Sequence, residues 1–288
     1  ALDNGFTPPH ANTGDQKVKN AINKCKNTAP GPDGIPYMAY KRMGNICHEI
    51  FQGLWNDLTY GSEDNIPDDF NHAILVCLPK KIAGTDPEHG DYYTPENTRP
   101  LSIVNTDNRI LAAAAKRTLE PSAEGWISQA QQGFLPKRSM VSNILEIELK
   151  AKEKIREGKK GAIILFDFKA AFPSMSQDFL QRVLHSVGLG DEWTKLLKKF
   201  YKHNLQKLGK EEEHFVARTG IRQGCPISPL LFVIAADLLL RKLGNEMLSI
   251  CVRAFADDTA VVLDNLEEQL PKILDIFECY AGFSNLHL

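Results

Sequence analysis

Two adjacent carboxylates, Asp257 and Asp258, interrupt the apolar run Ile250-Cys251-Val252-Arg253-Ala254-Phe255-Ala256-Asp257-Asp258-Thr259-Ala260-Val261-Val262. Strands of this composition normally exclude charge, and two neighbouring carboxylates repel each other and lose solvation. A bound divalent cation would reverse both penalties, because the ion becomes the largest local charge. The alternative is an ordinary turn, in which aspartate is common. Taken alone, the pair leaves the turn and the metal site equally open.

A second apolar run shifts the balance towards a metal site. Gly161-Ala162-Ile163-Ile164-Leu165-Phe166-Asp167-Phe168 has the composition of a buried strand and also delivers one aspartate at its end. Two such strands, paired side by side, would suit a centre that holds two ions about 3.5–4 Å apart. Asp167 and Asp257 are distant in the chain, so the tertiary fold must bring them together.

The totals describe a soluble globular chain. Its 288 residues allow one large domain or two interleaved ones, and no apolar run is long enough to span a membrane. The six cysteines form no Cys-x-x-Cys pair, which indicates neither a zinc site nor a disulfide framework and favours a reducing, intracellular compartment. Cys251 and Cys279 are expected in the core. The chain starts without Met or a signal peptide, and we expect it to be a fragment of a longer protein.

Basic residues gather in two clusters although the net charge is only −2. The clusters are Lys150, Lys152, Lys154, Arg156, Lys159 and Lys160, and Lys195, Lys198, Lys199, Lys202, Lys207 and Lys210. Both fall on predicted helices, so a solvated helix face is favoured over a nucleic-acid groove, which stays open.

Strand and helix patterns are mixed without a βαβ rhythm, which favours an α+β fold. Helices are expected at 16–27, 37–60, 106–119, 139–157, 178–187, 192–205, 228–242 and 265–280, and strands at 72–79 and 213–219, besides the two aspartate-bearing runs. Residues 82–96 are expected to be a polar loop, and Arg99 to Ile103 to lead into the helix at 106. Ser228 is expected to cap its helix with Pro229 in the first turn. Trp193, Leu196, Leu197 and Phe200 form an apolar stripe that predicts core packing.

A glycine- and proline-rich loop precedes one of these helices. Gly220-Ile221-Arg222-Gln223-Gly224-Cys225-Pro226-Ile227-Ser228-Pro229-Leu230-Leu231-Phe232 places Gly224 where another backbone or a ligand can approach closely. Loop amides and a helix N-terminus can hydrogen-bond a polar ligand. Alone, this stretch is weak evidence for a site.

In their order and spacing, these elements resemble the polymerase motifs of reverse transcriptases, RNA-directed DNA polymerases that act as nucleotidyltransferases. The three palm motifs are matched by 166–172, 222–229 and Phe255-Ala256-Asp257-Asp258. Upstream, Ala29-Pro30-Gly31-Pro32-Asp33-Gly34 and Arg99-Pro100-Leu101-Ser102 resemble finger motifs of non-long-terminal-repeat (LINE-type) retrotransposons. The resemblance covers roughly residues 24–288.

The resemblance implies a metal site and catalytic carboxylates. Asp167 and Asp257 would ligate two Mg²⁺, for which Mn²⁺ could substitute, and Asp258 would complete the carboxylate set. The backbone carbonyl of Phe168 would help hold the ion that binds the nucleotide. Magnesium prefers such oxygen ligands.

The resemblance also implies a substrate site. Lys80 and Arg99 would grip the triphosphate of the incoming dNTP, with Lys81 as a competitor of Lys80. Phe172 would be the aromatic gate that blocks a 2′-hydroxyl. Gln223, with Gly224 and the following loop, would contact nucleotide and template.

Each substrate role has a plainer alternative. Arg99 could form a local salt bridge or cap, although binding of the triphosphate is favoured. Phe172 could be a core residue, and Gln223 could hydrogen-bond only within its own loop. Lys169 and Arg222 receive no role, and we expect both in solvent.

The fold implied is α+β, a right-hand polymerase with fingers and an antiparallel palm sheet flanked by helices, and with the thumb absent. Fingers are expected at 1–125 and 176–226, and the palm at 126–175 and 227–288. Ala170 and Pro173 depart from many family members, which carry Lys and Asp there. The primer grip and thumb would lie beyond residue 288, so the fragment alone is expected to extend primers poorly.

The partners implied are an RNA template, a DNA or RNA primer and dNTPs, with no membrane. An endonuclease elsewhere in the full-length protein and a nuclear location would suit a retroelement. The alternatives are a group II intron-type or other cellular reverse transcriptase, an RNA-dependent RNA polymerase, a non-catalytic RNA-binding scaffold, and, last, a two-metal nuclease or phosphatase.

Overall fold

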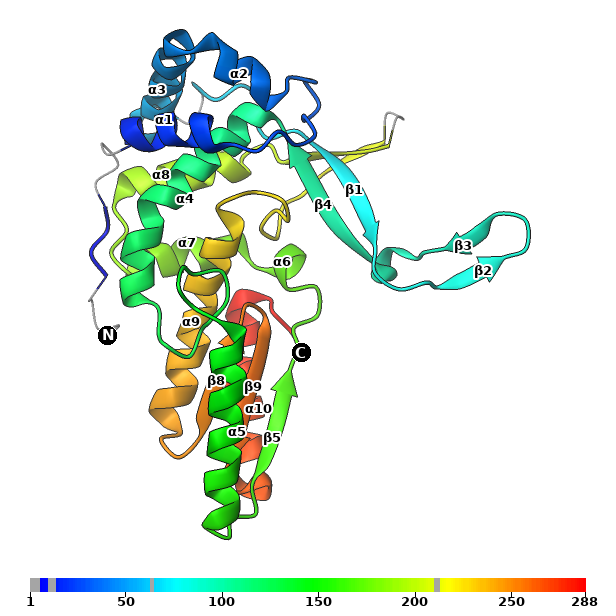
Figure 1. Ribbon diagram of the computed structural model, residues 1–288, viewed down its shortest axis with the longest axis vertical. Helices are drawn as coiled ribbons and strands as arrows, with labels where there is room; N and C mark the ends of the chain where they lie inside the picture. Colours follow the sequence, from blue (N-terminus) through cyan, green and yellow to red (C-terminus); the bar gives the residue numbers. More distant parts are fainter. Residues whose placement is uncertain (1–5, 10–13, 63–64, 210–212) are drawn as a thin grey trace.

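The protein is described from a computed structural model that covers residues 6–9, 14–62, 65–209 and 213–288. It is elongated, with a helical cap at one end, a four-stranded sheet beneath the cap and a three-stranded sheet at the other end (Figure 1). A small two-stranded hairpin projects to one side of the four-stranded sheet.

The helical cap is built from the first helices of the chain. They are α1 (Gly14–Lys24), α2 (Tyr37–Met43) and α3 (Asn45–Tyr60), which pack on one another, and α1 also packs on α4 (Thr106–Trp126). The single helix expected from 37 to 60 is interrupted at Gly44, which leaves helical conformation with a φ of 59°. Buried Phe51 and Trp55 of α3 anchor the cap to the core.

The four-stranded sheet has the order β4-β1-β6-β7. Its strands are β1 (Ala73–Pro79), β4 (Thr98–Val104), β6 (Leu205–Leu208) and β7 (His214–Val216). β4 runs antiparallel to β1, and β6 runs parallel to it. Arg99 to Ile103 leads into the helix at Thr106 as expected, and the stretch itself is strand, because its backbone pairs with that of β1.

The polar segment 82–96 is not the simple loop that we expected. It contains the hairpin β2 (Gly84–Asp86) and β3 (Gly90–Tyr92), followed by the short 3-10 helix Pro95–Asn97. The Asp86 carboxylate accepts hydrogen bonds from the backbone N–H groups of Glu88 and His89, at 2.9 and 2.8 Å, and so closes the turn. Backbone pairing and this local bond stabilise the hairpin without an apolar alternation.

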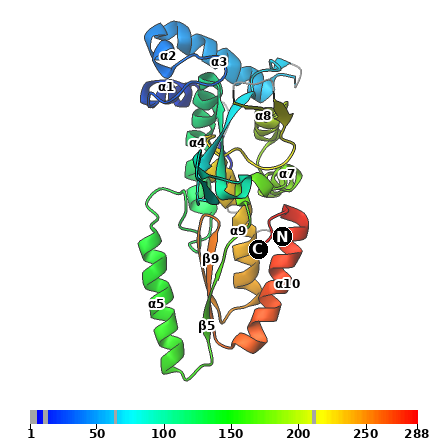
Figure 2. The same ribbon diagram turned by 90° about the vertical axis from the view of Figure 1, so that its right-hand side faces the viewer.

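The three-stranded sheet has the order β5-β9-β8 and is antiparallel throughout. Its strands are β5 (Ala162–Phe166), β8 (Cys251–Phe255) and β9 (Asp258–Leu263). Helix α5 (Met140–Arg156) lies on one face, and α9 (Ser228–Glu246) and α10 (Leu266–Ser284) lie on the other (Figure 2). The stacked rings of Phe166 and Phe277, 4.6 Å apart, join β5 to α10.

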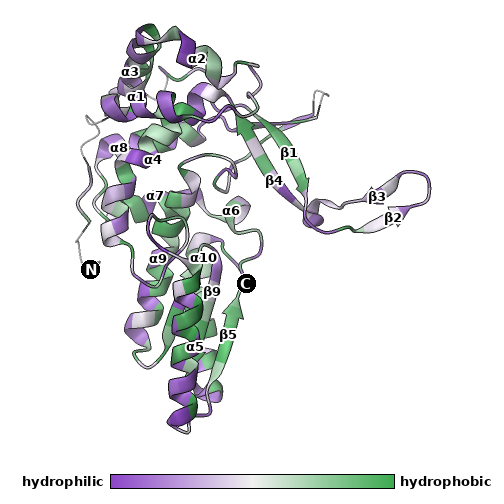
Figure 3. Cartoon of the chain, viewed as in Figure 1, coloured by the Kyte–Doolittle hydropathy of each residue, from purple (hydrophilic) through white to green (hydrophobic). Residues whose placement is uncertain are grey.

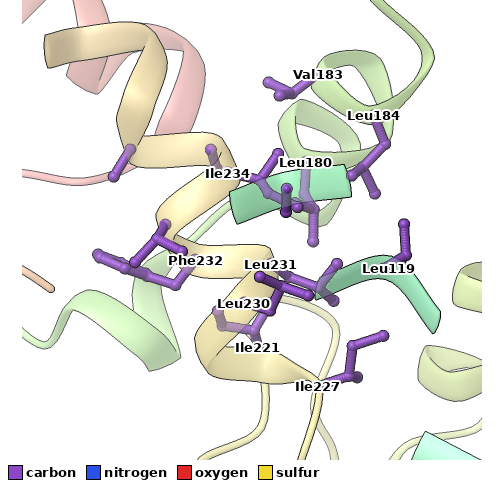
Figure 4. Close-up of a cluster of buried hydrophobic side chains, with 14 of the residues drawn as sticks. Leu119, Leu180, Val183, Leu184, Ile221, Ile227, Leu230, Leu231, Phe232 and Ile234 are labelled. Atoms are coloured by element: carbon purple, nitrogen blue, oxygen red, sulfur yellow. The ribbon is translucent and has the colours of Figure 1, made fainter. Parts of the chain in front are cut away.

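Helix α9 forms the centre of the core. Its side chains lie among those of α4 and α7 (Gln177–Ser186), as Figure 4 shows for Leu119, Leu180 and Leu231, and its ribbon is largely apolar (Figure 3). Pro229 lies in its first turn as predicted, but Ile227 occupies the N-cap position, so the predicted Ser228 cap is wrong.

Helix α8 (Asp191–Tyr201) confirms the predicted apolar stripe, since all four of its members are fully buried. The basic clusters are mixed in outcome. Lys150 and Lys152 of α5 each pair with a glutamate of the same helix, as a solvated face would. Lys199 is instead buried, with its ammonium donating to the carbonyls of Asp57 and Gly61, and Lys210 lies outside the described residues.

Two further expectations concern cysteines and membranes. Cys251 is buried as expected, but Cys279 is exposed, because it lies on the outer side of α10. Across the described ranges, no helix combines the length and the apolar character that crossing a bilayer requires.

Candidate active site

The β8–β9 hairpin carries the adjacent aspartates at its tip. Phe255 pairs with Asp258, so Ala256 and Asp257 form a two-residue turn. Ala256 has a φ of 59°, the left-handed conformation that tight hairpin turns demand. The turn predicted as the plain alternative is therefore present, and it is the same turn that presents the two carboxylates.

The third carboxylate reaches this tip through strand pairing. Phe166 at the end of β5 is paired with Thr259 of β9, so Asp167 follows at the level of Asp258. The sheet thus brings together the ends of the two aspartate-bearing runs, as the sequence required for a shared site.

The electrostatics of Asp257 report this proximity. Burial raises the pKa of its half-buried carboxyl group, its own backbone N–H lowers it, and the like charges of Asp258 and Asp167 raise it further, while Arg99 lowers it. Within the described part of the chain, no three His, Cys, Asp or Glu side chains converge closely enough to enclose a metal ion.

The donor set nevertheless has the chemistry of a magnesium site. It consists of the carboxylate oxygens of three aspartates, of which Asp167 and Asp258 are exposed and Asp257 is half-buried. Phe168 follows directly, and its side chain is buried against Phe277 and Tyr280 of α10, with ring centroids 5.8 and 6.4 Å away. Packing of this ring fixes the backbone just after Asp167, where the predicted carbonyl ligand lies.

Phe172 follows Asp167 along the chain and lies on the short helix α6 (Ala171–Ser174). Its half-buried ring stacks on Phe232 of α9, with centroids 5.0 Å apart, and meets the edge of Phe134 at 6.1 Å. The ring is thus held on two sides but is not a fully buried core residue.

The loop of Gln223 and Gly224 contacts the four-stranded sheet. The carbonyl of Gln223 accepts a 2.9 Å hydrogen bond from the backbone N–H of Ser102 in β4. Gly224 has a φ of 101°, and a Cβ there would lie 2.9 Å from both Leu101 and the carbonyl of Ser102. Glycine is therefore required by both conformation and space. A cavity of about 320 Å³ adjoins Gln223, and none of the three aspartates lines it.

The predicted triphosphate-binding residues lie at one end of the β1–β4 pair. Arg99 pairs with Leu78 in the strand register, and Lys80 follows β1 directly. Both side chains are exposed, and within the described residues neither forms an ion pair closer than 4.0 Å. Arg99 still acts on the pKa of Asp257, which places it within electrostatic reach of the carboxylates. Lys81 is exposed as well, so it remains a competitor of Lys80.

Arg222 contradicts the expectation of solvent exposure, whereas Lys169 meets it. The guanidinium of Arg222 donates to the side chain of Asn71 and the carbonyl of Phe200 and lies over the ring of Tyr201. These partners bury the cation and tie the loop to α8. Its position in a polar, glycine-rich loop gave no local signal of this role.

A family model for "Reverse transcriptase (RNA-dependent DNA polymerase)" matches residues 79–288, which include the three carboxylates and the loop of Gln223. The chain belongs to the reverse transcriptase family. The resemblance stated from the motifs is thereby confirmed, as is the predicted class of enzyme, a nucleotidyltransferase.

Relatives of this reverse transcriptase chain include retrotransposon proteins. It is 27% identical over 263 residues to the Retrovirus-related Pol polyprotein from type-2 retrotransposable element R2DM of Drosophila melanogaster, covering 86% of the chain and 23% of that protein. It is 26% identical over 275 residues to the Transposon TX1 uncharacterized 149 kDa protein of Xenopus laevis, covering 91% and 20%. The chain thus spans about a fifth to a quarter of the length of these two relatives.

A solved structure supports the reverse transcriptase fold. The structure of apo telomerase from Candida tropicalis, truncated from its C-terminal domain, matches with a TM-score of 0.50 at 13% identity. The match covers 83% of this chain and 54% of that one. At this identity the likeness concerns the fold, and it confirms the predicted fingers-and-palm class.

Proposed function

We propose that the chain extends a primer 3′-hydroxyl with dNTPs on an RNA template, as the polymerase core of a LINE-type retrotransposon protein. Family membership supports RNA-directed DNA synthesis. The observation that carries the proposal is the strand register, which sets Asp167 level with Asp258 and beside the turn of Asp257, at one end of the three-stranded sheet.

The three carboxylates and the Phe168 carbonyl would hold two Mg²⁺, with Mn²⁺ as a substitute. Oxygen donors fit this ion, and the repulsion that raises the pKa of Asp257 is the penalty that a cation removes. Magnesium bound there would lower the pKa of the primer hydroxyl and screen the leaving pyrophosphate. The protein's part is to hold the carboxylates at the end of the sheet where the ions would bind.

Arg99 and Lys80 would bind the triphosphate. Both are exposed cations at the same end of β1 and β4, and neither is engaged by a carboxylate within the described residues. Exposed basic side chains at one strand end suit a ligand that brings its own negative charge.

Phe172 would select deoxynucleotides. Its ring is wedged between Phe232 and Phe134, so it yields little to a ribose 2′-hydroxyl that approaches its free edge. Gln223 and Gly224 would border the nucleotide and template, beside the cavity of about 320 Å³.

The partners proposed are therefore an RNA template, a DNA or RNA primer and dNTPs. The greater length of the relatives accommodates further domains, including the thumb and an endonuclease. A retroelement polymerase of this kind would act inside the cell and reach chromosomal DNA in the nucleus.

Primer extension by the full-length protein that carries this chain tests the proposal. The assay compares dNTPs with NTPs on RNA and DNA templates, with and without Mg²⁺. Asp257→Asn is the test variant, and Asp275→Asn, at an exposed site on α10, is the matched control. Extension with dNTPs on RNA that is lost in Asp257→Asn and retained in Asp275→Asn is expected. Template binding by folded protein without any extension would overturn the proposal in favour of a non-catalytic scaffold.

A further inference from the structure

The segment between α4 and α5 lies against the aspartate-bearing hairpin. The backbone N–H of Ala254 donates to the carbonyl of Ala130, and the N–H of Gln132 donates to the carbonyl of Ala254, both at 2.8 Å. Gln131 and Ala254 form a parallel bridge. Residues 130–133 thus extend the sheet beside β8, at the strand end that leads into the turn.

Gln131 binds the turn itself through its side chain. Its fully buried amide accepts hydrogen bonds from the N–H groups of Ala256 and Gly133, both at 2.8 Å, and donates to the carbonyl of Ala256 at 3.1 Å. One side chain therefore satisfies both backbone groups of Ala256. The orientation of the amide is forced, because a flipped amide would set its NH₂ group against two N–H donors.

The residue that Gln131 holds is the strained one. Ala256 has a φ of 59°, a conformation that is unfavourable for a residue with a Cβ and persists only where the surroundings impose it. Asp257 is the next residue, so the peptide plane fixed by Gln131 sets the direction in which the Asp257 side chain leaves the turn.

The segment is held rigidly from behind. The guanidinium of Arg138 donates to four carbonyls, those of Glu124, Ile127, Ser128 and Gln131, at 2.6–2.9 Å. Gly133 allows the segment to come close, since a Cβ there would lie 2.3 Å from the backbone nitrogen of Ala256. Contacts run in sequence from Arg138 to Gln131, from Gln131 to Ala256, and from there to Asp257.

We propose that Gln131 is a positioning residue for catalysis: by clamping both backbone groups of Ala256, it holds the Asp257 carboxylate in the orientation that polymerisation needs. The proposal rests on the proposed function. Gln131 is a buried neutral amide, and its part in the reaction is to hold the backbone next to Asp257.

Gln131→Met tests the clamp, because it keeps the length of the side chain and removes all three hydrogen bonds. The matched control is Asn143→Leu. The Asn143 amide is also buried and donates a 2.9 Å hydrogen bond to β8, at the carbonyl of Ala254, two residues before the turn. Both variants of the full-length protein are measured for thermal stability, for primer-extension kcat and KM, for the Mg²⁺ concentration that gives half-maximal rate, and for amide hydrogen exchange over 251–258.

We expect Gln131→Met to lower kcat by about 10- to 100-fold, with KM for dNTP changed less than about threefold, and to raise the Mg²⁺ requirement and the exchange at the turn. Asn143→Leu should lose stability to a similar extent and less than about threefold in kcat. Equal losses of kcat in the two variants at equal stability would overturn the proposal.

Ala256→Gly gives an independent readout. Glycine adopts a positive φ without strain, so the double variant Gln131→Met/Ala256→Gly should regain at least about threefold in kcat over Gln131→Met. A merely structural loss would not be rescued in this way. If Gln131→Met does not fold, Gln131→Glu replaces it, since a carboxylate keeps both acceptor bonds and loses the donor to the Ala256 carbonyl. An unchanged kcat in Gln131→Glu would then overturn the proposal.

Failure of the clamp and failure of the proposed function are distinguishable. Inactive unmodified protein would refute the function, and hydrogen exchange at 251–258 would still test the clamp. Active protein with an unaffected Gln131→Met would refute the clamp alone.

Discussion

Gly133→Ala should destabilise the protein, because residue 133 lies against the backbone of the hairpin turn. The added Cβ would lie 2.3 Å from the nitrogen and 2.9 Å from the Cα of Ala256, and 3.0 Å from the amide oxygen of Gln131. The nearest obstacle is backbone, which cannot rotate away, so either the turn or the 130–133 segment must shift by about 1 Å to restore an ordinary contact.

The magnitude follows from two opposing effects. Overpacking of a close-packed site costs about 1–3 kcal/mol, and strained hydrogen bonds from Gln131 add to this cost. Alanine also lowers the conformational entropy of the unfolded chain, which raises the free energy of unfolding by about 0.4–1 kcal/mol. We expect a net loss of about 1–3 kcal/mol, which corresponds to a fall in Tm of about 2–12 °C for a chain of this size.

Gly53→Ala is the matched control. Gly53 lies within α3, and a Cβ there would meet nothing within 4 Å. The same chemical change should stabilise this helix by up to about 1 kcal/mol. Urea unfolding of both variants, followed by circular dichroism, measures the two free energies. The reasoning is refuted if Gly133→Ala lies within about 0.5 kcal/mol of the unmodified protein or gains stability as Gly53→Ala does.

Three further outcomes are expected. In metal-free buffer, Asp257→Asn should stabilise the protein at pH 7. The pKa of Asp257 is raised in the folded state, so the native protein binds this proton more tightly than the unfolded chain does. The stability that the bound proton contributes below the unfolded pKa of about 3.9 is lost as the pH rises through the folded pKa, and asparagine avoids this loss. Unfolding free energies from pH 4 to 8 check this, and a less stable variant at pH 7 would contradict it. Phe172→Val should raise the kcat/KM for NTPs relative to dNTPs by at least about tenfold, or 1.4 kcal/mol, and an unchanged ratio in primer extension would remove Phe172 as the gate. Lys199→Met should cost about 1–3 kcal/mol in urea unfolding, because the carbonyls of Asp57 and Gly61 lose the buried ammonium that donates to both, and a neutral result would count against this buried contact.

The carboxylates could be found from the sequence because charge within an apolar strand is anomalous. Asp167, Asp257 and Asp258 each stand at the end of such a run, and family motifs supplied their roles. The pairing of Phe166 with Thr259 could not be predicted from spacing, since strand register is set by tertiary contacts. Their roles as catalytic and metal-binding residues stay predictions.

Other parts of the site give no local signal. Arg222 is a cation in a glycine-rich loop, a pattern typical of solvent exposure, and the groups that bury it come from α8 and from Asn71. Gln131 is one of several polar residues in its segment, and its partner Ala256 lies 125 residues further along the chain. Such roles depend on partners that only folding brings near.

The hydrogen bond between Ser102 and Gln223 has a consequence for motion. Because the Ser102 N–H holds the Gln223 carbonyl at 2.9 Å, β4 and the loop are coupled mechanically. Arg99 lies three residues before Ser102 on the same strand. A displacement of β4 that carries Arg99 towards or away from the carboxylates must therefore take Gln223 with it or break this bond. Arg99, proposed to bind the triphosphate, and Gln223, proposed to contact the nucleotide and template, would then move together when substrate binds.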